Sequence, residues 1–310
     1  MFTLLNRPWR RLWSTVPTST SLRVCWRSVS TQRIHEHMDD KIAEYEVRGF
    51  TVIKDILNKD EISCVQEHVS WLMRKYPDTD PELLEHWFMR DDPFWLSLCA
   101  HDKLVDIAAA FLGTGDIALF ASHYVVKMSE TGKAIHWHQD GSYWPLDPME
   151  VISLWLAVDD STVENGCMQV VPYSHSDGLS VTNLSSGDFN RNVSDYEDKV
   201  HLTETQVSSI ENVELKAGSI SIHHPMLIHG SLANHSEKRR AGLTLRYIPT
   251  TTTVIEDPQD IDGKASGSVF LMRGQKRAAN RYREIPAFDK SRHFSASIPC
   301  GFTDRYCATI

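Results

Sequence analysis

The chain has 310 residues, which is enough to bury a sizeable core in one large domain or two ordinary ones. Hydrophobic residues make up 41% and charged residues 24%, and the net charge of −9 argues against a general nucleic-acid-binding protein. No apolar run approaches the roughly 18 to 20 residues that a membrane-spanning helix needs. Six scattered cysteines without a CxxC motif predict reduced thiols rather than a disulfide framework.

The first 33 residues differ from the rest of the chain in charge. They hold six arginines and no Asp or Glu, and Ser and Thr are frequent among them. This composition is typical of an organelle transit peptide, so we expect residues 1–33 to be a leader and the protein to be mitochondrial. The alternatives are a disordered tail over the same residues and a peroxisomal or cytoplasmic location.

Helical patterns precede the strands. An amphipathic helix is predicted over 35–49, followed by a short strand over 50–53. Asn58 has the position of a helix cap because Glu61 follows it three residues later, and the apolar spacing predicts a helix through 62–72. A further helical stretch is predicted over 93–112, with Gly113 ending it.

From residue 117 onward the pattern favours strands. β-Branched and aromatic runs occupy 117–128, 151–158, 166–171, 214–223 and 241–248, with turn signals between them. Such short strands predict an antiparallel sandwich or barrel. We therefore expect one mainly β domain over 34–310, with core strands at about 117–250 and the N-terminal helices packed on it. The polar residues 185–212 are predicted to form a long loop over the mouth of the barrel.

One short stretch supplies two candidate metal ligands. His138 and Asp140 are two residues apart, and on a strand such side chains point to the same face. His229 is the best candidate for a third ligand. Two histidines and one carboxylate form the facial triad of non-heme Fe(II) oxygenases. His136, two residues before His138, is the strongest rival ligand.

Three segments in this order give the chain a resemblance to the phytanoyl-CoA dioxygenase family. They are HWHQDGSYW at 136–144, NGCMQVVPYSH at 165–175 and HHPMLIHGS at 223–231, with Arg240 beyond them. The resemblance covers roughly residues 40–250. It implies a double-stranded β-helix, the cupin-like jelly roll, which agrees with the strand pattern.

The resemblance also implies roles for particular residues. His138, Asp140 and His229 match the iron ligands. Arg240, 11 residues past His229, matches the arginine that binds the far carboxylate of 2-oxoglutarate. Arg239 is its rival, because only one of two neighbours on a strand can point inward. Three further positions match cosubstrate contacts: Ser231, Trp155 and His123.

The implied activity is an Fe(II)- and 2-oxoglutarate-dependent dioxygenase of the EC 1.14.11 type. Such an enzyme uses O2, releases succinate and CO2 and hydroxylates a small organic substrate, for which a CoA thioester or another anionic metabolite is the candidate, with ascorbate as a reductant. The carboxylate of Asp140 favours hydroxylation, because halogenases of this superfamily carry a small residue there. The alternatives are a zinc- or manganese-dependent cupin-type enzyme that does not use 2-oxoglutarate, and a catalytically silent family member. No nucleic-acid partner is expected, and the sequence does not predict the oligomeric state. The basic run at 273–283 has two interpretations, a solvated face or a contact with an anionic substrate.

Overall fold

The computed structural model describes residues 29–84, 91–142, 144–179, 200–255, 268–284 and 288–296. The chain divides into two compact units, Met1–His37 and Met38–Ile310, and all the described strands belong to the second. The predicted leader falls mostly outside the described residues and stays a prediction. None of the described helices combines the length and apolarity that spanning a bilayer requires.

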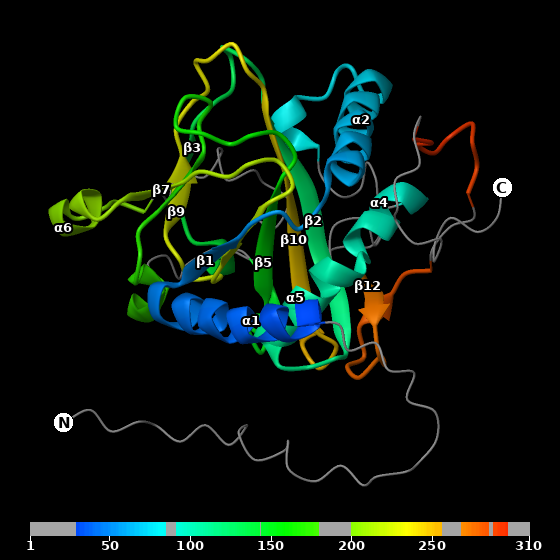
Figure 1. Cartoon of the computed structure of the whole chain (residues 1–310), viewed down its shortest axis with the longest axis horizontal. Coiled ribbons are helices and arrows are strands. Elements are labelled where there is room, and N and C mark those ends of the chain that lie inside the picture. The colour runs from blue at the N-terminus through cyan, green and yellow to red at the C-terminus, as the bar shows by residue number, and fades with distance from the viewer. Residues whose placement is uncertain are drawn as a thin grey trace, which may run out of the picture. The chain divides into compact units, whose positions relative to one another are not determined.

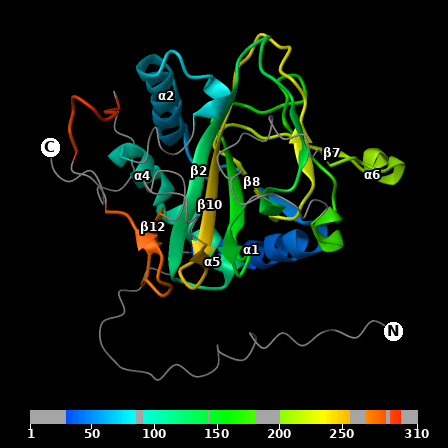
Figure 2. The ribbon, with the colours of Figure 1, turned by 180° about the vertical axis from the view of Figure 1, so that it is seen from behind.

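Two antiparallel sheets form the body of the second unit (Figures 1 and 2). The large sheet has the order β1-β8-β5-β10-β2-β12-β13, with only its last pair parallel, and the small sheet has the order β3-β9-β6-β7. A third sheet pairs β11 with β4. The strands are β1 Phe50–Ile53, β2 Ile117–Lys127, β3 Ile135–His138, β4 Leu146–Asp147, β5 Ile152–Ala157, β6 Met168–Val170, β7 Glu211–Val213, β8 Ile220–His223, β9 His229–Ser231, β10 Arg240–Pro249, β11 Thr253–Val254, β12 Ser268–Arg273 and β13 Arg281–Tyr282.

Short helices accompany the sheets, and the fold is the predicted double-stranded β-helix. Figure 1 shows α2 and α4 on one side of the large sheet and the small sheet on the other. The helical segments are α1 Val29–Arg48, α2 Lys59–Lys75, η2 Pro81–Leu83, α4 Pro93–Cys99, α5 Asp102–Leu112, η3 Asp140–Ser142, η4 Ser174–Asp177 and α6 Glu204–Ser208.

The residues of β10 show that the large sheet has an apolar face in the main core and a more polar face toward the small sheet. Leu243, Leu245 and Tyr247 belong to the main apolar core, together with buried residues of α2, α4 and α5. Because side chains alternate along a strand, Arg240, Gly242, Thr244 and Arg246 lie on the opposite face. That face looks toward the small sheet, since Trp155 and Ala157 of β5 pack with Met168 and Val170 of β6.

Two of the helix signals in the sequence are confirmed. Asn58 caps α2 by accepting hydrogen bonds from the backbone of Asp60 and Glu61, and the Glu61 side chain completes the capping box. Gly113 ends α5 in the left-handed conformation, with φ of 67°.

Three expectations are wrong in detail. The predicted helix over 93–112 is two helices, because α4 ends at Cys99 and the His101 side chain caps α5. The predicted loop over 185–212 contains α6 and the start of β7 in its described part, residues 200–212. Cys64 is disulfide-bonded, whereas Cys99 and Cys167 are free and buried.

Gly242 offers a test of this packing. A Cβ atom at Gly242 would overlap the indole ring of Trp155. We expect Gly242→Ala to lower the free energy of unfolding by about 1–3 kcal/mol, the usual cost of overpacking. Gly115→Ala is the matched control, because no atom lies within 4 Å of its added Cβ, and its effect should stay within about 0.5 kcal/mol. Urea unfolding followed by circular dichroism measures both, and equal effects would contradict this packing.

Candidate metal centre

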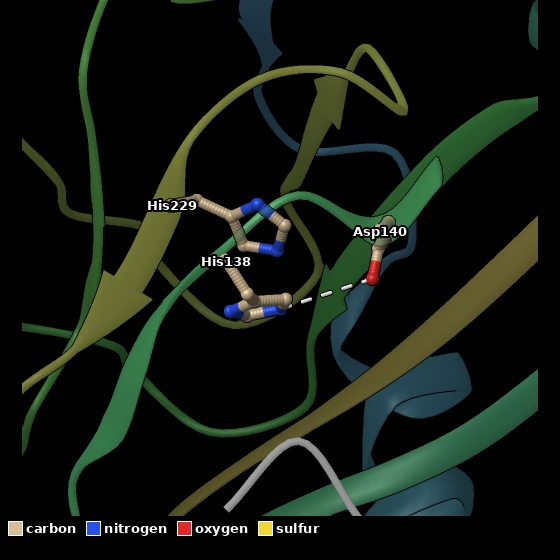
Figure 3. Close-up of side chains that lie close together, drawn as sticks. All are labelled: His138, Asp140 and His229. Atoms are coloured by element: carbon tan, nitrogen blue, oxygen red, sulfur yellow. Dashed lines mark ion pairs between the residues drawn. The ribbon is translucent and has the colours of Figure 1, made fainter. Parts of the chain in front are cut away.

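Three chain segments bring the candidate ligands together (Figure 3). His138 is the last residue of β3 and His229 the first of β9, and the two are directly paired in the small sheet. Asp140 follows in the short 3-10 turn η3. The premise that His138 and Asp140 share a strand is therefore wrong, although the turn still directs the carboxylate toward the two rings.

The three side chains are close enough to share one ion. One nitrogen or oxygen atom from each of them lies within 4.8 Å of the others, and this is the one such cluster found among the described residues. The two imidazole rings are 4.1 Å apart between centroids. The Nε2 atom of His138 lies 3.8 Å from Oδ1 of Asp140 (Figure 3). All three residues are buried.

Backbone carbonyls fix the protonation of both histidines. Nδ1 of His138 lies 2.8 Å from the carbonyl oxygen of His136, and Nδ1 of His229 lies 3.0 Å from that of Leu227. A carbonyl oxygen only accepts, so each Nδ1 carries the proton and each Nε2 presents a lone pair. Hydrogen bonds of this kind orient histidine ligands in metal sites.

The pKa shifts leave the cluster in the charge state that a metal needs. Burial lowers the pKa of His138, and burial together with the neighbouring His138 lowers the pKa of His229 further. For Asp140, burial opposes ionisation, but the Arg246 charge and the His223 hydrogen bond hold its pKa well below the usual value. Two neutral imidazoles and one carboxylate result, as metal coordination requires.

Two residues that hold Asp140 were missed or undervalued in the sequence. Arg246 donates from Nη2 to the carboxylate oxygens at 3.3 and 3.5 Å, and its guanidinium lies over the Trp144 ring at 4.9 Å. Nε2 of His223, a histidine outside the predicted triad, lies 3.5 Å from Oδ2. Arg246 is six residues past Arg240, and this even spacing on one strand is the signal that could have identified it as facing the site.

His136, the rival ligand, is not part of the cluster. Regular alternation would have put its side chain on the same face as His138. The pairing of β3 with β9 is irregular between Ile135 and His138, and such a bulge breaks the alternation. Its backbone carbonyl nevertheless supports His138.

Arg239 and Arg240 have different surroundings in the structure. Arg239 donates two hydrogen bonds to the carboxylate of Asp159, from Nε at 2.7 Å and from Nη2 at 2.9 Å. Arg240 is 2% exposed, and its Nε and Nη2 find no hydrogen-bond acceptor among the described residues. Its guanidinium carbon lies 5.3 Å from the centre of the Trp155 ring, which is also buried.

Ser231 and His123, the other two residues predicted to contact the cosubstrate, have different surroundings. Ser231 is buried, and its hydroxyl has no partner among the described residues. His123 pairs with Thr244 across the strands, and its Nδ1 lies 3.0 Å from Nη1 of Arg246. Because a guanidinium only donates, this nitrogen accepts, and His123 belongs to the network that supports Asp140.

The donor set indicates which metal fits. Imidazole and carboxylate ligands on one side of a site, with no cysteine, suit a non-heme Fe(II) ion. The fold and this cluster therefore define a mononuclear metal-binding protein of the double-stranded β-helix class.

Solved structures share this fold. The non-heme monooxygenase ThoJ, in its apo form, is 20% identical with a TM-score of 0.59, covering 82% of this chain and 92% of that one. The epimerase SnoN from nogalamycin biosynthesis, in complex with Fe3+, alpha ketoglutarate and nogalamycin RO, is 18% identical with a TM-score of 0.58, covering 83% and 98%.

Sequence comparison identifies the family. Residues 45–242 match the profile described as Phytanoyl-CoA dioxygenase (PhyH). The chain belongs to the phytanoyl-CoA dioxygenase family. A "Phytanoyl-CoA dioxygenase" of Arabidopsis thaliana is 32% identical over 161 residues, 51% of this chain and 53% of that protein. The "Phytanoyl-CoA dioxygenase domain-containing protein 1" of Mus musculus is 25% identical over 183 residues, 57% and 60%. The chain thus spans little more than half the length of these two relatives.

Removing a ligand should abolish tight metal binding. Loss of an orienting partner already costs about 10- to 100-fold in affinity, so we expect His138→Ala or His229→Ala to weaken Fe(II) binding at least ~100-fold. Anaerobic titration calorimetry measures this. His136→Ala is the matched control, because it keeps the carbonyl that supports His138. A loss in His136→Ala as large as in His138→Ala would refute the assignment.

Proposed function

We propose that the protein is an Fe(II)- and 2-oxoglutarate-dependent dioxygenase that hydroxylates a small organic substrate and releases succinate and CO2. The observation that carries this proposal is that two features lie together between the two sheets. The first is the buried His-Asp-His cluster. The second is Arg240, a buried guanidinium that pairs with no carboxylate among the described residues and lies on the same face of β10 as the arginine that holds Asp140. Membership of the family supports the proposal.

The chain's own groups prepare the metal site. His138, Asp140 and His229 would hold Fe(II), and bound iron supplies the redox chemistry that couples decarboxylation of 2-oxoglutarate to oxidation of a C–H bond. The carbonyls behind the two imidazoles keep Nε2 directed at the site. Arg246 and His223 keep the carboxylate of Asp140 ionised and oriented.

Arg240 has the geometry to bind the far carboxylate of 2-oxoglutarate. Its two unpartnered groups, Nε and Nη2, lie side by side on one edge of the guanidinium, which is the fork that binds a carboxylate through two parallel hydrogen bonds. Burial lowers its pKa to about 10, so it stays charged at neutral pH. The ring of Trp155 flanks the fork, and Gly242 leaves room for that ring.

We propose an anionic metabolite, with a CoA thioester as first candidate, as the substrate, and ascorbate as the reductant. The names of the relatives support the choice of substrate. Several are called phytanoyl-CoA dioxygenase, and a Stutzerimonas stutzeri relative, 29% identical over 154 residues, is named "Probable alpha-ketoglutarate-dependent hypophosphite dioxygenase".

The test is turnover of 2-oxoglutarate with a panel of carboxylate- and CoA-bearing metabolites, Fe(II) and ascorbate. We expect at least one metabolite to stimulate succinate formation. In Arg240→Leu the KM for 2-oxoglutarate should rise about 100-fold, the order expected when charge-assisted hydrogen bonds are lost. Arg239→Leu, which loses only its bonds to Asp159, should keep the wild-type KM. A metal-loaded chain that neither binds nor consumes 2-oxoglutarate would refute the proposal.

We also propose that the protein is imported into mitochondria, supported by the arginine-rich, acid-free residues 1–33. A fluorescent fusion at the C-terminus of the full chain should colocalise with mitochondria. Replacing the six arginines of this segment by glutamine should leave the fusion outside them. Unchanged localisation after this replacement would contradict the proposal.

A further inference from the structure

A second buried cation, Lys127, lies beside Arg240. Lys127 on β2 and Arg240 on β10 are directly opposite in the antiparallel register. Directly opposed residues have their side chains on the same face, with Cβ atoms about 4.5–5.5 Å apart. Lys127 is fully buried and Arg240 is 2% exposed. Like charges in this arrangement repel each other, and burial removes the water that would screen them.

The described part of the chain supplies little that neutralises this pair. Neither cation forms an ion pair with a described residue. The ammonium of Lys127 donates to the carbonyl oxygen of Leu232, which satisfies one of its three N–H groups. That carbonyl directly follows Ser231, whose hydroxyl is itself without a described partner. Lys127 and Arg240, each with N–H groups that have no acceptor among the described residues, therefore lie side by side on one face of the large sheet.

Three titratable groups influence Lys127 from the elements around it. Arg240 opposes its charge from β10 and Glu82 favours it from η2, whereas Cys167, the residue before β6, would favour it only as a thiolate. Glu82 forms no ion pair with Lys127, and its Oε1 accepts the backbone N–H of Lys133 at 2.6 Å. Burial raises the pKa of the Cys167 thiol to about 11, so it carries no charge at neutral pH.

We infer that Lys127 is a second residue for the far carboxylate of 2-oxoglutarate, and that this carboxylate binds together with a proton taken up by Lys127. The inference rests on the proposed function. A carboxylate on the Arg240 fork places negative charge beside the ammonium, and this charge stabilises the protonated form. The neighbourhood is thus a two-cation site that is complete only when the anion is bound.

The direction in which 2-oxoglutarate affinity changes with pH follows from the protonation of Lys127 before the cosubstrate binds. Burial, and then the charge of Arg240, lower the pKa of Lys127 to about 7, so near that pH the lysine is partly neutral. The bound carboxylate raises this pKa, so binding takes up a proton. Affinity is then greatest below pH 7 and is lost as the pH rises, by up to about tenfold per pH unit. Both carboxylates of 2-oxoglutarate stay ionised over this range and contribute no change.

Calorimetry of the full chain loaded with Mn(II) measures this uptake without turnover. Titrating 2-oxoglutarate in two buffers of different ionisation enthalpy gives the number of protons taken up. We expect about half a proton near pH 7 and nearly one at pH 8.5. 2-Oxopentanoate, which has the same carbon chain but no far carboxylate, should bind without this uptake.

Two variants isolate Lys127, and a third is the control. In Lys127→Met the uptake should disappear, and at pH 6.5 the Kd for 2-oxoglutarate should be about 10- to 100-fold weaker. Lys127→Arg keeps the charge without titrating, so its Kd should not change between pH 6.5 and 8.5. Lys238→Met removes an exposed charge two residues from Arg240 and should behave as wild type.

The outcomes separate the two proposals. If wild-type protein binds 2-oxoglutarate without proton uptake and Lys127→Met binds it equally well, the role of Lys127 is refuted and the proposed function stands. If the Mn(II)-loaded protein binds no 2-oxoglutarate at any pH, the proposed function itself fails.

Discussion

Between its two sheets, the protein holds three cations, Lys127, Arg240 and Arg246, on one face of the large sheet. Among the described residues, Asp140 is the one carboxylate that pairs with any of them. Removing an ion from water costs several kcal/mol unless an opposite charge and hydrogen bonds replace the water. Arg246 and Asp140 meet this requirement for each other. Arg240 has no such partner among the described residues, and the carboxylate of a bound 2-oxoglutarate would supply one.

The fold can accommodate these buried charges because the large sheet has two different faces. The face toward α2, α4 and α5 is apolar and belongs to the main core, so it contributes most of the hydrophobic stabilisation. The opposite face is thereby free to carry charged and polar side chains. The small sheet closes over it and brings His138 and His229 from neighbouring strands to the same place. One face of these strands therefore carries the buried charges, and the other face packs in the main apolar core.

Much of the site was predictable from the sequence, and the rest depended on geometry that spacing does not encode. The motifs identified His138, Asp140 and His229, and the family spacing chose Arg240 over Arg239. The two hydrogen bonds that join Arg239 to Asp159 are seen only in the structure. The bulge in β3 and the turn at Asp140 are local departures from a regular strand, which alternation cannot foresee. Lys127 could not be recognised from the sequence, because its inferred role depends on Arg240, which lies opposite it in the sheet.

We propose that one iron ion and one 2-oxoglutarate bind together between the two sheets. Anomalous diffraction at the iron edge, from crystals grown anaerobically with Fe(II) and 2-oxoglutarate, would locate both. A single iron peak is expected within bonding distance of His138, Asp140 and His229, with the far carboxylate on the fork of Arg240. An iron peak elsewhere in the chain, or a cosubstrate bound away from Arg240, would contradict it.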